Sequence, residues 1–443
     1  MTPIKNFAEY EISEMNGFLP DVLLKELPGE FSEWDRIVKN LPKLIESKMI
    51  RQEVEKLPQL NVEKLVTLPE KRRAYSILCM IEQAYLFGGG GNLPHNPLSG
   101  ESVPPQELPS QVAVPLHTVA ENLGLPTALT HATVDLYNWE LIDKNQPISL
   151  DNLKSIETFT GTIDEQWFYL VMVAIEAEGA PIIQYSQLLI ELMMENDREG
   201  VTSCLDAIRK RLGNMAEIVR RTREKCDPKF FYHVLRKFLS GYNDKKTFQY
   251  GLKMSGVIDK RTKDSDVGTI GPMYVNYAGG SAAQSSLIQL IDRMFAVKHE
   301  KDSVKNFLKD MHNYMPRQHR KFLEYVENQY EHYSLKDYCM DQNLSEVYNQ
   351  CLSELENFRK AHFGLVHTYI LPFIEQMAHG EAKGTGGTEL KKFLSATIDD
   401  TKSTQIRQGE QKKMYRCSPK TLGMLAMCTF IGYIGWRWGT PPY

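Results

Sequence analysis

The stretch from Ser345 to Leu371 constrains the fold more than any other part of the chain. Its apolar and aromatic side chains recur at steps of three and four residues, so they line one face of a long helix. These side chains are Val347, Cys351, Leu355, Phe358, Leu365 and Tyr369. Pro372 is expected to end the helix, because proline lacks the amide hydrogen that a helix needs. We expect the rest of the chain to be organised around this element.

His362 falls on the same apolar stripe, and Arg359 lies one turn earlier on its flank. An imidazole that faces a core must be hydrogen-bonded or metal-bound, because its nitrogens are costly to bury without partners. Spacing alone leaves open whether His362 is a satisfied core residue or a ligand.

Composition narrows the function classes. The chain has 443 residues, of which 42% are hydrophobic, so it is long enough for two or three domains with sizeable cores. Its 52 Lys and Arg are balanced by 56 Asp and Glu, so its composition gives no indication of nucleic-acid binding. Its seven cysteines are scattered without a C-x-x-C pair, which argues against a disulfide framework and a cysteine zinc site. The N-terminus resembles neither a secretory signal nor a transit peptide, so we expect a cytoplasmic protein.

The periodicity along the chain predicts helices and no strand, hence an all-α fold. We expect helices at 31–57 with a break near Pro42, 70–87, 112–123, 126–139, 164–194 with a kink or split at Pro181, 200–225, 228–239, 281–297 after a tight turn at Gly279 and Gly280, and a short helix through Phe393. The polar residues 144–152 predict a boundary between a small helical domain, 1–150, and a larger one, 151–400. Residues 401–443 form a polar linker and an apolar tail.

Two glycine-rich segments, 88–109 and 383–388, read as loops, since neither has the Lys-Ser/Thr ending of a phosphate-binding loop. Ser281 with Gln284 three residues later is a capping-box pattern for a helix start. Arg236 lies among apolar residues of a predicted helix. The sequence pattern does not decide whether its side chain reaches the surface and pairs there or has a functional role. Many helices, a core histidine and a nearby arginine are compatible with a haem that has one axial imidazole and an arginine near a propionate. They do not select haem over a structural core.

Six runs of sequence resemble the indoleamine 2,3-dioxygenase family and occur in that family's order. They are SIETFTGTIDEQWFYLV (155–171), DPKFFYHVLRKFLSGY (227–242), AGGSAAQSS (278–286), NFLKDMHNYMPRQHRKFLEYVE (306–327), FRKAHFGLVHTYI (358–370) and KGTGGT (383–388). The N-terminal YEISEMNGFLP and LPKLIESKMIRQEVEKL are also similar, so the resemblance covers the chain to about residue 400.

This resemblance implies one haem b, bound between a small and a large helical domain, with His362 on the iron and Arg359 in the haem surroundings. It also implies oxidative opening of the indole ring of L-tryptophan by O₂ to give N-formylkynurenine, the first step of the kynurenine route, in a protein that we expect to be a monomer. The haem supplies the oxygen chemistry, and no side chain need act as a base.

The family pattern also assigns substrate contacts. Phe231 and Arg236 contact the substrate, with the arginine pairing with its carboxylate, and Phe168 packs against the indole. The remaining positions, near the distal face and in the closing loop, are Ser281, Ala282 and Thr385.

Three departures affect this pocket. Met172 stands where the family commonly has a serine near the distal side, and His131 and Asp135 stand where tyrosine and an aliphatic residue are expected. An aspartate in an apolar pocket is costly unless it meets a partner such as His131. Besides the dioxygenase, two alternatives stay open: an O₂-binding or redox-sensing haem protein with little tryptophan turnover, and a haem-bound interaction protein.

The uncharged run from Leu422 to Trp436 lies beyond the family's usual end. It is shorter than the roughly 20 residues that a spanning helix prefers. An extra element docked on the domain and a short tail anchor in an intracellular membrane both remain open.

Overall fold

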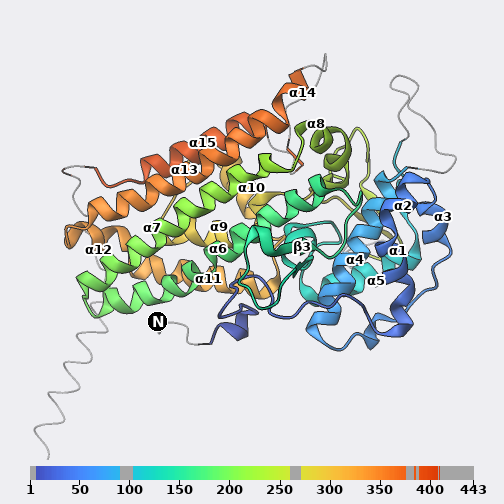
Figure 1. Ribbon diagram of the computed structural model, residues 1–443, viewed down its shortest axis with the longest axis horizontal. Coiled ribbons are helices and arrows are strands. Elements are labelled where there is room, and N and C mark those ends of the chain that lie inside the picture. The colour runs from blue at the N-terminus through green and yellow to red at the C-terminus, as the bar shows by residue number, and fades with distance from the viewer. Residues whose placement is uncertain are drawn as a thin grey trace, which may run out of the picture. The chain divides into compact units, whose positions relative to one another are not determined.

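Long helices dominate the computed structural model of the chain (Figure 1). The structure describes residues 6–89, 103–259, 271–375, 384–385, 389–407 and 409. Residues up to Gln405 form one unit, to which the following description applies. The predicted tail segment from Leu422 to Trp436, and most of the loop 383–388, lie outside the described residues.

The all-α prediction is confirmed, and several helices lie close to their expected bounds, although the three helices between residues 302 and 341 were not predicted. The α-helices are α1 (Ser32–Lys39), α2 (Leu41–Glu46), α3 (Ile50–Glu55), α4 (Leu68–Phe87), α5 (Ser110–Leu123), α6 (Ile163–Met194), α7 (Arg198–Arg220), α8 (Pro228–Phe230), α9 (Ser286–Met294), α10 (Asp302–His312), α11 (Arg317–His332), α12 (Leu335–Asp341), α13 (Ser345–Tyr369), α14 (Leu371–Glu375) and α15 (Leu390–Ser403). No helix among the described residues is both long and apolar enough to cross a membrane.

The expectation that no strand forms is wrong for a few short segments. Strand β4 (Leu252–Ile258) lies between β1 (Glu107–Leu108), which is parallel to it, and β5 (Pro272–Val275), which is antiparallel. A hairpin pairs β2 (Trp139–Leu141) with β3 (Leu153–Ser155). Most of these strands are too short to produce a recognisable alternation of polar and apolar residues.

The β2–β3 hairpin replaces the end of the helix predicted at 126–139. Only a π-helical turn, Ala132–Leu136, forms there. The polar segment 144–152, predicted as a domain boundary, is the connection of this hairpin. Across that connection, the buried Arg73 of α4 forms ion pairs of 2.6 Å with Asp35 of α1 and with Glu157. These ion pairs therefore connect the N-terminal helices α1 and α4 to the segment that leads into α6.

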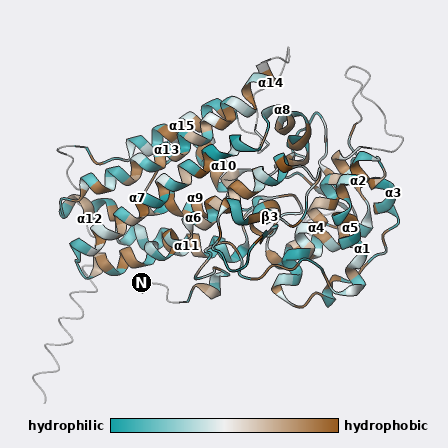
Figure 2. Ribbon diagram, viewed as in Figure 1, coloured by the Kyte–Doolittle hydropathy of each residue, from teal (hydrophilic) through white to brown (hydrophobic). Residues whose placement is uncertain are grey.

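Helix α13 packs between α7 and α15, as expected for the organising element (Figure 1). Its buried face includes Tyr348, whose hydroxyl donates to the carbonyl of Phe295 at 2.8 Å. Apolar and polar residues alternate around α7 and α13, which is typical of helices covered on one side (Figure 2). The helix ends at Tyr369, three residues before Pro372, which instead occupies the first turn of α14, where its missing amide hydrogen is not needed.

Two further helix predictions need correction. Helix α6 runs unbroken through Pro181 from Ile163 to Met194, so the proline does not split it. The helix predicted at 228–239 is irregular: α8 passes into a π-helical turn, Phe231–Leu235, and then into a 3-10 turn, Arg236–Leu239. Wide and tight turns in succession are frequent near functional sites.

Candidate functional site

A cavity of about 260 Å³ opens among segments that are far apart in sequence. It lies between α6, the π-helical turn 132–136, the irregular segment 231–239, residues 280–285, α13 and α15. The structure brings every predicted site residue to its wall. These residues are Phe168, Met172, Phe231, Arg236, Ser281, Ala282, Arg359, His362 and Thr385.

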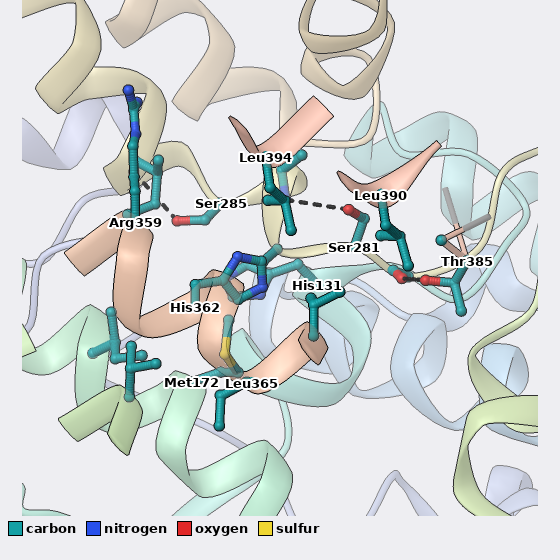
Figure 3. Close-up of a pocket in the computed structure, with 18 of the residues that line it drawn as sticks. His131, Met172, Ser281, Ser285, Arg359, His362, Leu365, Thr385, Leu390 and Leu394 are labelled. Carbon is teal, nitrogen blue, oxygen red and sulfur yellow. Dashed lines mark hydrogen bonds between the residues drawn. The ribbon is translucent and has the colours of Figure 1, made fainter. Parts of the chain in front are cut away.

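His362 projects from α13 into the space that the labelled residues of Figure 3 surround. Burial lowers the pKa of its imidazole, so the ring is neutral at physiological pH. Among the described residues, no side chain or backbone group forms a hydrogen bond with this ring. A neutral imidazole with a free nitrogen facing a cavity is the form that binds a metal.

Arg359 also lines the cavity, but described residues already hold its guanidinium. It forms an ion pair with Asp292 of α9, and it donates to the carbonyl of Thr397 at 2.8 Å and to the hydroxyl of Thr401. Burial alone would raise the pKa of Asp292, yet the charges of Arg359 and His299 hold it below its usual value. Arg359 thus joins α13 to α9 and α15 within one turn of His362.

An aromatic wall stands beside Arg236. The Phe231 ring packs against Phe168 of α6 at 4.8 Å between centroids and against Tyr369 of α13 at 5.7 Å. Arg236, one turn further along, lies 5.3 Å from the centre of the Tyr232 ring. Burial lowers the pKa of this guanidinium, which still stays charged at physiological pH. A guanidinium group next to packed aromatic rings is suited to bind a flat aromatic molecule that carries a carboxylate.

The backbone at Gly279 and Gly280 holds Thr385 against the cavity. The amide of Gly279 donates to the Thr385 carbonyl at 3.1 Å, and the Thr385 hydroxyl donates to the Gly280 carbonyl at 2.6 Å. A Cβ atom at Gly279 would lie 2.1 Å from the carbonyl oxygen of Leu239, so only glycine fits. Thr385 therefore contacts the predicted site by specific bonds.

The capping-box prediction for Ser281 and Gln284 is wrong in its detail. Ser281 begins a 3-10 turn, Ala282–Gln284, while the side chain of Ser285 accepts the hydrogen bond that caps α9. The Gln284 side chain instead accepts from the backbone amide of His131 at 3.0 Å. This turn consequently links the cavity wall at Ser281 to the wall at His131.

The partner expected for Asp135 is present. His131 Nδ1 lies 2.6 Å from Asp135 Oδ2, and Nε2 lies 2.9 Å from Oε1 of Glu176, all three residues being buried. Burial opposes protonation of His131, but the two carboxylates outweigh it and raise its pKa to about 10. Burial also raises the pKa of Asp135. The result is a charged cluster in the cavity wall.

The family model for indoleamine 2,3-dioxygenase matches residues 6–404. The chain belongs to the indoleamine 2,3-dioxygenase family. It is 33% identical to "Indoleamine 2,3-dioxygenase 1" of Rattus norvegicus, a match that covers 90% of this chain and 95% of the relative. It is 34% identical to "Indoleamine 2,3-dioxygenase nanC" of Aspergillus nanangensis, over 90% and 98% of the two chains. The Saccharomyces cerevisiae "Indoleamine 2,3-dioxygenase" is 31% identical, over 93% and 96%.

The cofactor of the indoleamine 2,3-dioxygenase family is haem b, and the residues of this cavity fit it. The neutral imidazole of His362 would hold the haem iron through its unprotonated nitrogen. Around it the wall is largely apolar, with Leu365 and Val366 from α13 and Leu394 from α15, which suits the face of a porphyrin (Figure 3).

The sequence did not single out Glu176, Ser285 or Asp292. Glu176 lies in the apolar run WFYLVMVAIEAEGA, and Asp292 lies in LIQLIDRMF. A carboxylate within an apolar helical run was the available signal, because a buried charge needs a partner. Which partner it meets depends on the packing of the helices.

Proposed function

We propose that this chain is a haem-dependent dioxygenase that opens the indole C2–C3 bond of L-tryptophan with O₂ to give N-formylkynurenine. The observation that carries the proposal is one cavity that joins a neutral, ligand-ready His362 to the Phe168, Phe231 and Arg236 wall. Family membership across residues 6–404 supports the same reaction. Both atoms of O₂ enter the product, so the reaction needs no external reductant.

Each residue has a role that its surroundings permit. His362 holds the haem, which when bound supplies the oxygen chemistry. Arg236 pairs with the substrate carboxylate, and Phe168 and Phe231 hold the indole plane. Thr385, bonded to Gly280, covers the cavity near Ser281 and Ala282 and keeps water from the reacting groups. Met172 takes a place on the wall where the family commonly has a serine.

The test uses the purified full-length protein loaded with haemin and reduced under nitrogen. After addition of L-tryptophan and ¹⁸O₂, N-formylkynurenine absorbance and a mass increase from two ¹⁸O atoms are expected. A normal Soret band with O₂ binding but no product would contradict this proposal and favour the alternative, an O₂-binding or redox-sensing haem protein. The His131–Asp135–Glu176 cluster favours that alternative, because charged groups in an indole pocket weaken tryptophan binding.

Three further proposals concern the whole chain. We place the small domain at 1–150, the large haem-binding domain at 151–400 and the linker with its tail at 401–443. We expect the protein to be a cytoplasmic monomer. Membrane contact through Leu422 to Trp436 stays a prediction, which flotation of the full chain and of a 1–405 chain with liposomes would test.

A further inference from the structure

The cluster of His131, Asp135 and Glu176 has more acceptors than donors. His131 Nε2 is hydrogen-bonded to Glu176 Oε1 at 2.9 Å, whereas Nδ1 lies 2.6 Å from Asp135 Oδ2 in an ion pair whose geometry is not that of a hydrogen bond. The Ser285 hydroxyl donates to the same Glu176 oxygen, Oε1, at 2.6 Å. Asp135 Oδ1 and Glu176 Oε2 are both buried and have no hydrogen-bond partner among the described residues. Two carboxylate oxygens of the cavity wall therefore have no donor among the described residues.

Unmatched buried oxygens of this kind are costly, since they have lost water without gaining another partner. Both residues line the cavity and are at most 4% exposed. An unsubstituted hydrocarbon ring edge that packs against Asp135 and Glu176 would not supply a donor, so the free-energy cost of the unpaired oxygens would remain. A ligand that brings a hydrogen-bond donor would remove it.

The position of the cluster shows which part of a substrate it would meet. Along α6, Glu176 is eight residues beyond Phe168, which corresponds to about 12 Å of helix. Phe168 packs on Phe231, one turn before Arg236, whereas Asp135 pairs with His131, which also contacts Glu176. The carboxylate and ammonium of an α-amino acid share one carbon, so both stay at the Arg236 end. The far edge of the ring is the part that extends toward the cluster.

We propose that Asp135 and Glu176 make this cavity select indole amino acids whose ring carries a hydrogen-bond donor, such as a hydroxyl, on the edge farthest from the amino-acid group. This inference rests on the proposed function for the orientation of the substrate. The donor would bond to Asp135 Oδ1 or Glu176 Oε2, and His131 would hold both carboxylates in place.

The test compares substituents of similar size at the same ring position. The holoenzyme is titrated with L-tryptophan and with its 5-hydroxy, 6-hydroxy, 5-methyl and 6-methyl derivatives. Dissociation constants come from the change in the Soret band, and kcat/KM comes from product formation. At one or both positions the hydroxyl should bind at least about tenfold more tightly than the methyl group. Equal affinity at both positions would overturn the proposal.

Variants then assign the effect to the cluster. Asp135→Val removes one unmatched oxygen and should reduce the hydroxyl-to-methyl affinity ratio to near one, whereas Asp135→Asn, which preserves the shape, should give an intermediate ratio. Leu136→Met is the control, because Leu136 follows Asp135 in the chain, does not line the cavity and leaves both carboxylates in place; its ratio should match the wild type. A ratio that survives in Asp135→Val and Asp135→Asn would refute the role of Asp135. If no indole gives product but the binding ratio persists, the proposed reaction fails while the selectivity stands.

Discussion

Replacing Arg236 with alanine is the sharpest test of substrate orientation. Its guanidinium lines the cavity, and burial lowers its pKa, so it lies in poorly solvated surroundings. Two unit charges 4 Å apart at an effective dielectric constant of 20 attract by about 4 kcal/mol, of which desolvation of the substrate carboxylate takes back a part. A net loss of about 2–3 kcal/mol corresponds to a fall in kcat/KM for L-tryptophan of about 30- to 150-fold.

The assay pairs the variant with tryptamine, which has the indole and the ammonium group but no carboxylate. Wild-type protein should prefer tryptophan over tryptamine by about the same factor, and Arg236→Ala should lose that preference. Lys237→Ala is the matched control, because Lys237 is the next residue, is exposed and lies over the Phe238 ring. An Arg236→Ala protein that discriminates the two amines as strongly as wild type would refute the carboxylate pairing.

Three other predictions follow from buried groups. His362→Ala should lose the normal Soret band after reconstitution, with recovery on addition of free imidazole; an unchanged spectrum without imidazole would remove the axial assignment. Asp292→Asn leaves the buried Arg359 short of its counter-charge and should lower the free energy of unfolding by about 3 kcal/mol in urea, whereas a change below about 0.5 kcal/mol would count against the ion pair. Burial lowers the pKa of His319 to about 3, below its unfolded value of about 6.5, so its contribution to stability is complete above pH 6.5 and is lost as the pH falls toward 3. Between pH 6.5 and pH 5 the wild type should therefore lose about 2 kcal/mol more than His319→Gln, and equal losses would contradict this explanation.

Helix bounds could be predicted from the sequence where apolar residues recur at regular spacing over several turns. The helices α4, α6, α7 and α13 form within a few residues of their predicted bounds, because apolar residues at helical spacing report one buried face. The prediction failed at 126–139 and at 228–239, where the chain forms π-helical and 3-10 turns. These turns have helical composition, and only contacts with other segments decide their hydrogen-bond pattern.

The sequence by itself determined the helical class, the place of His362 on a core-facing stripe, and the family motifs in their order. Only the tertiary structure decided which charges meet. His131 and Glu176 are 45 residues apart, and Asp292 and Arg359 are 67 residues apart, yet both pairs are buried and in contact. Helical periodicity depends on neighbours within one or two turns, whereas a buried ion pair exists only once separate helices have packed and excluded water between them.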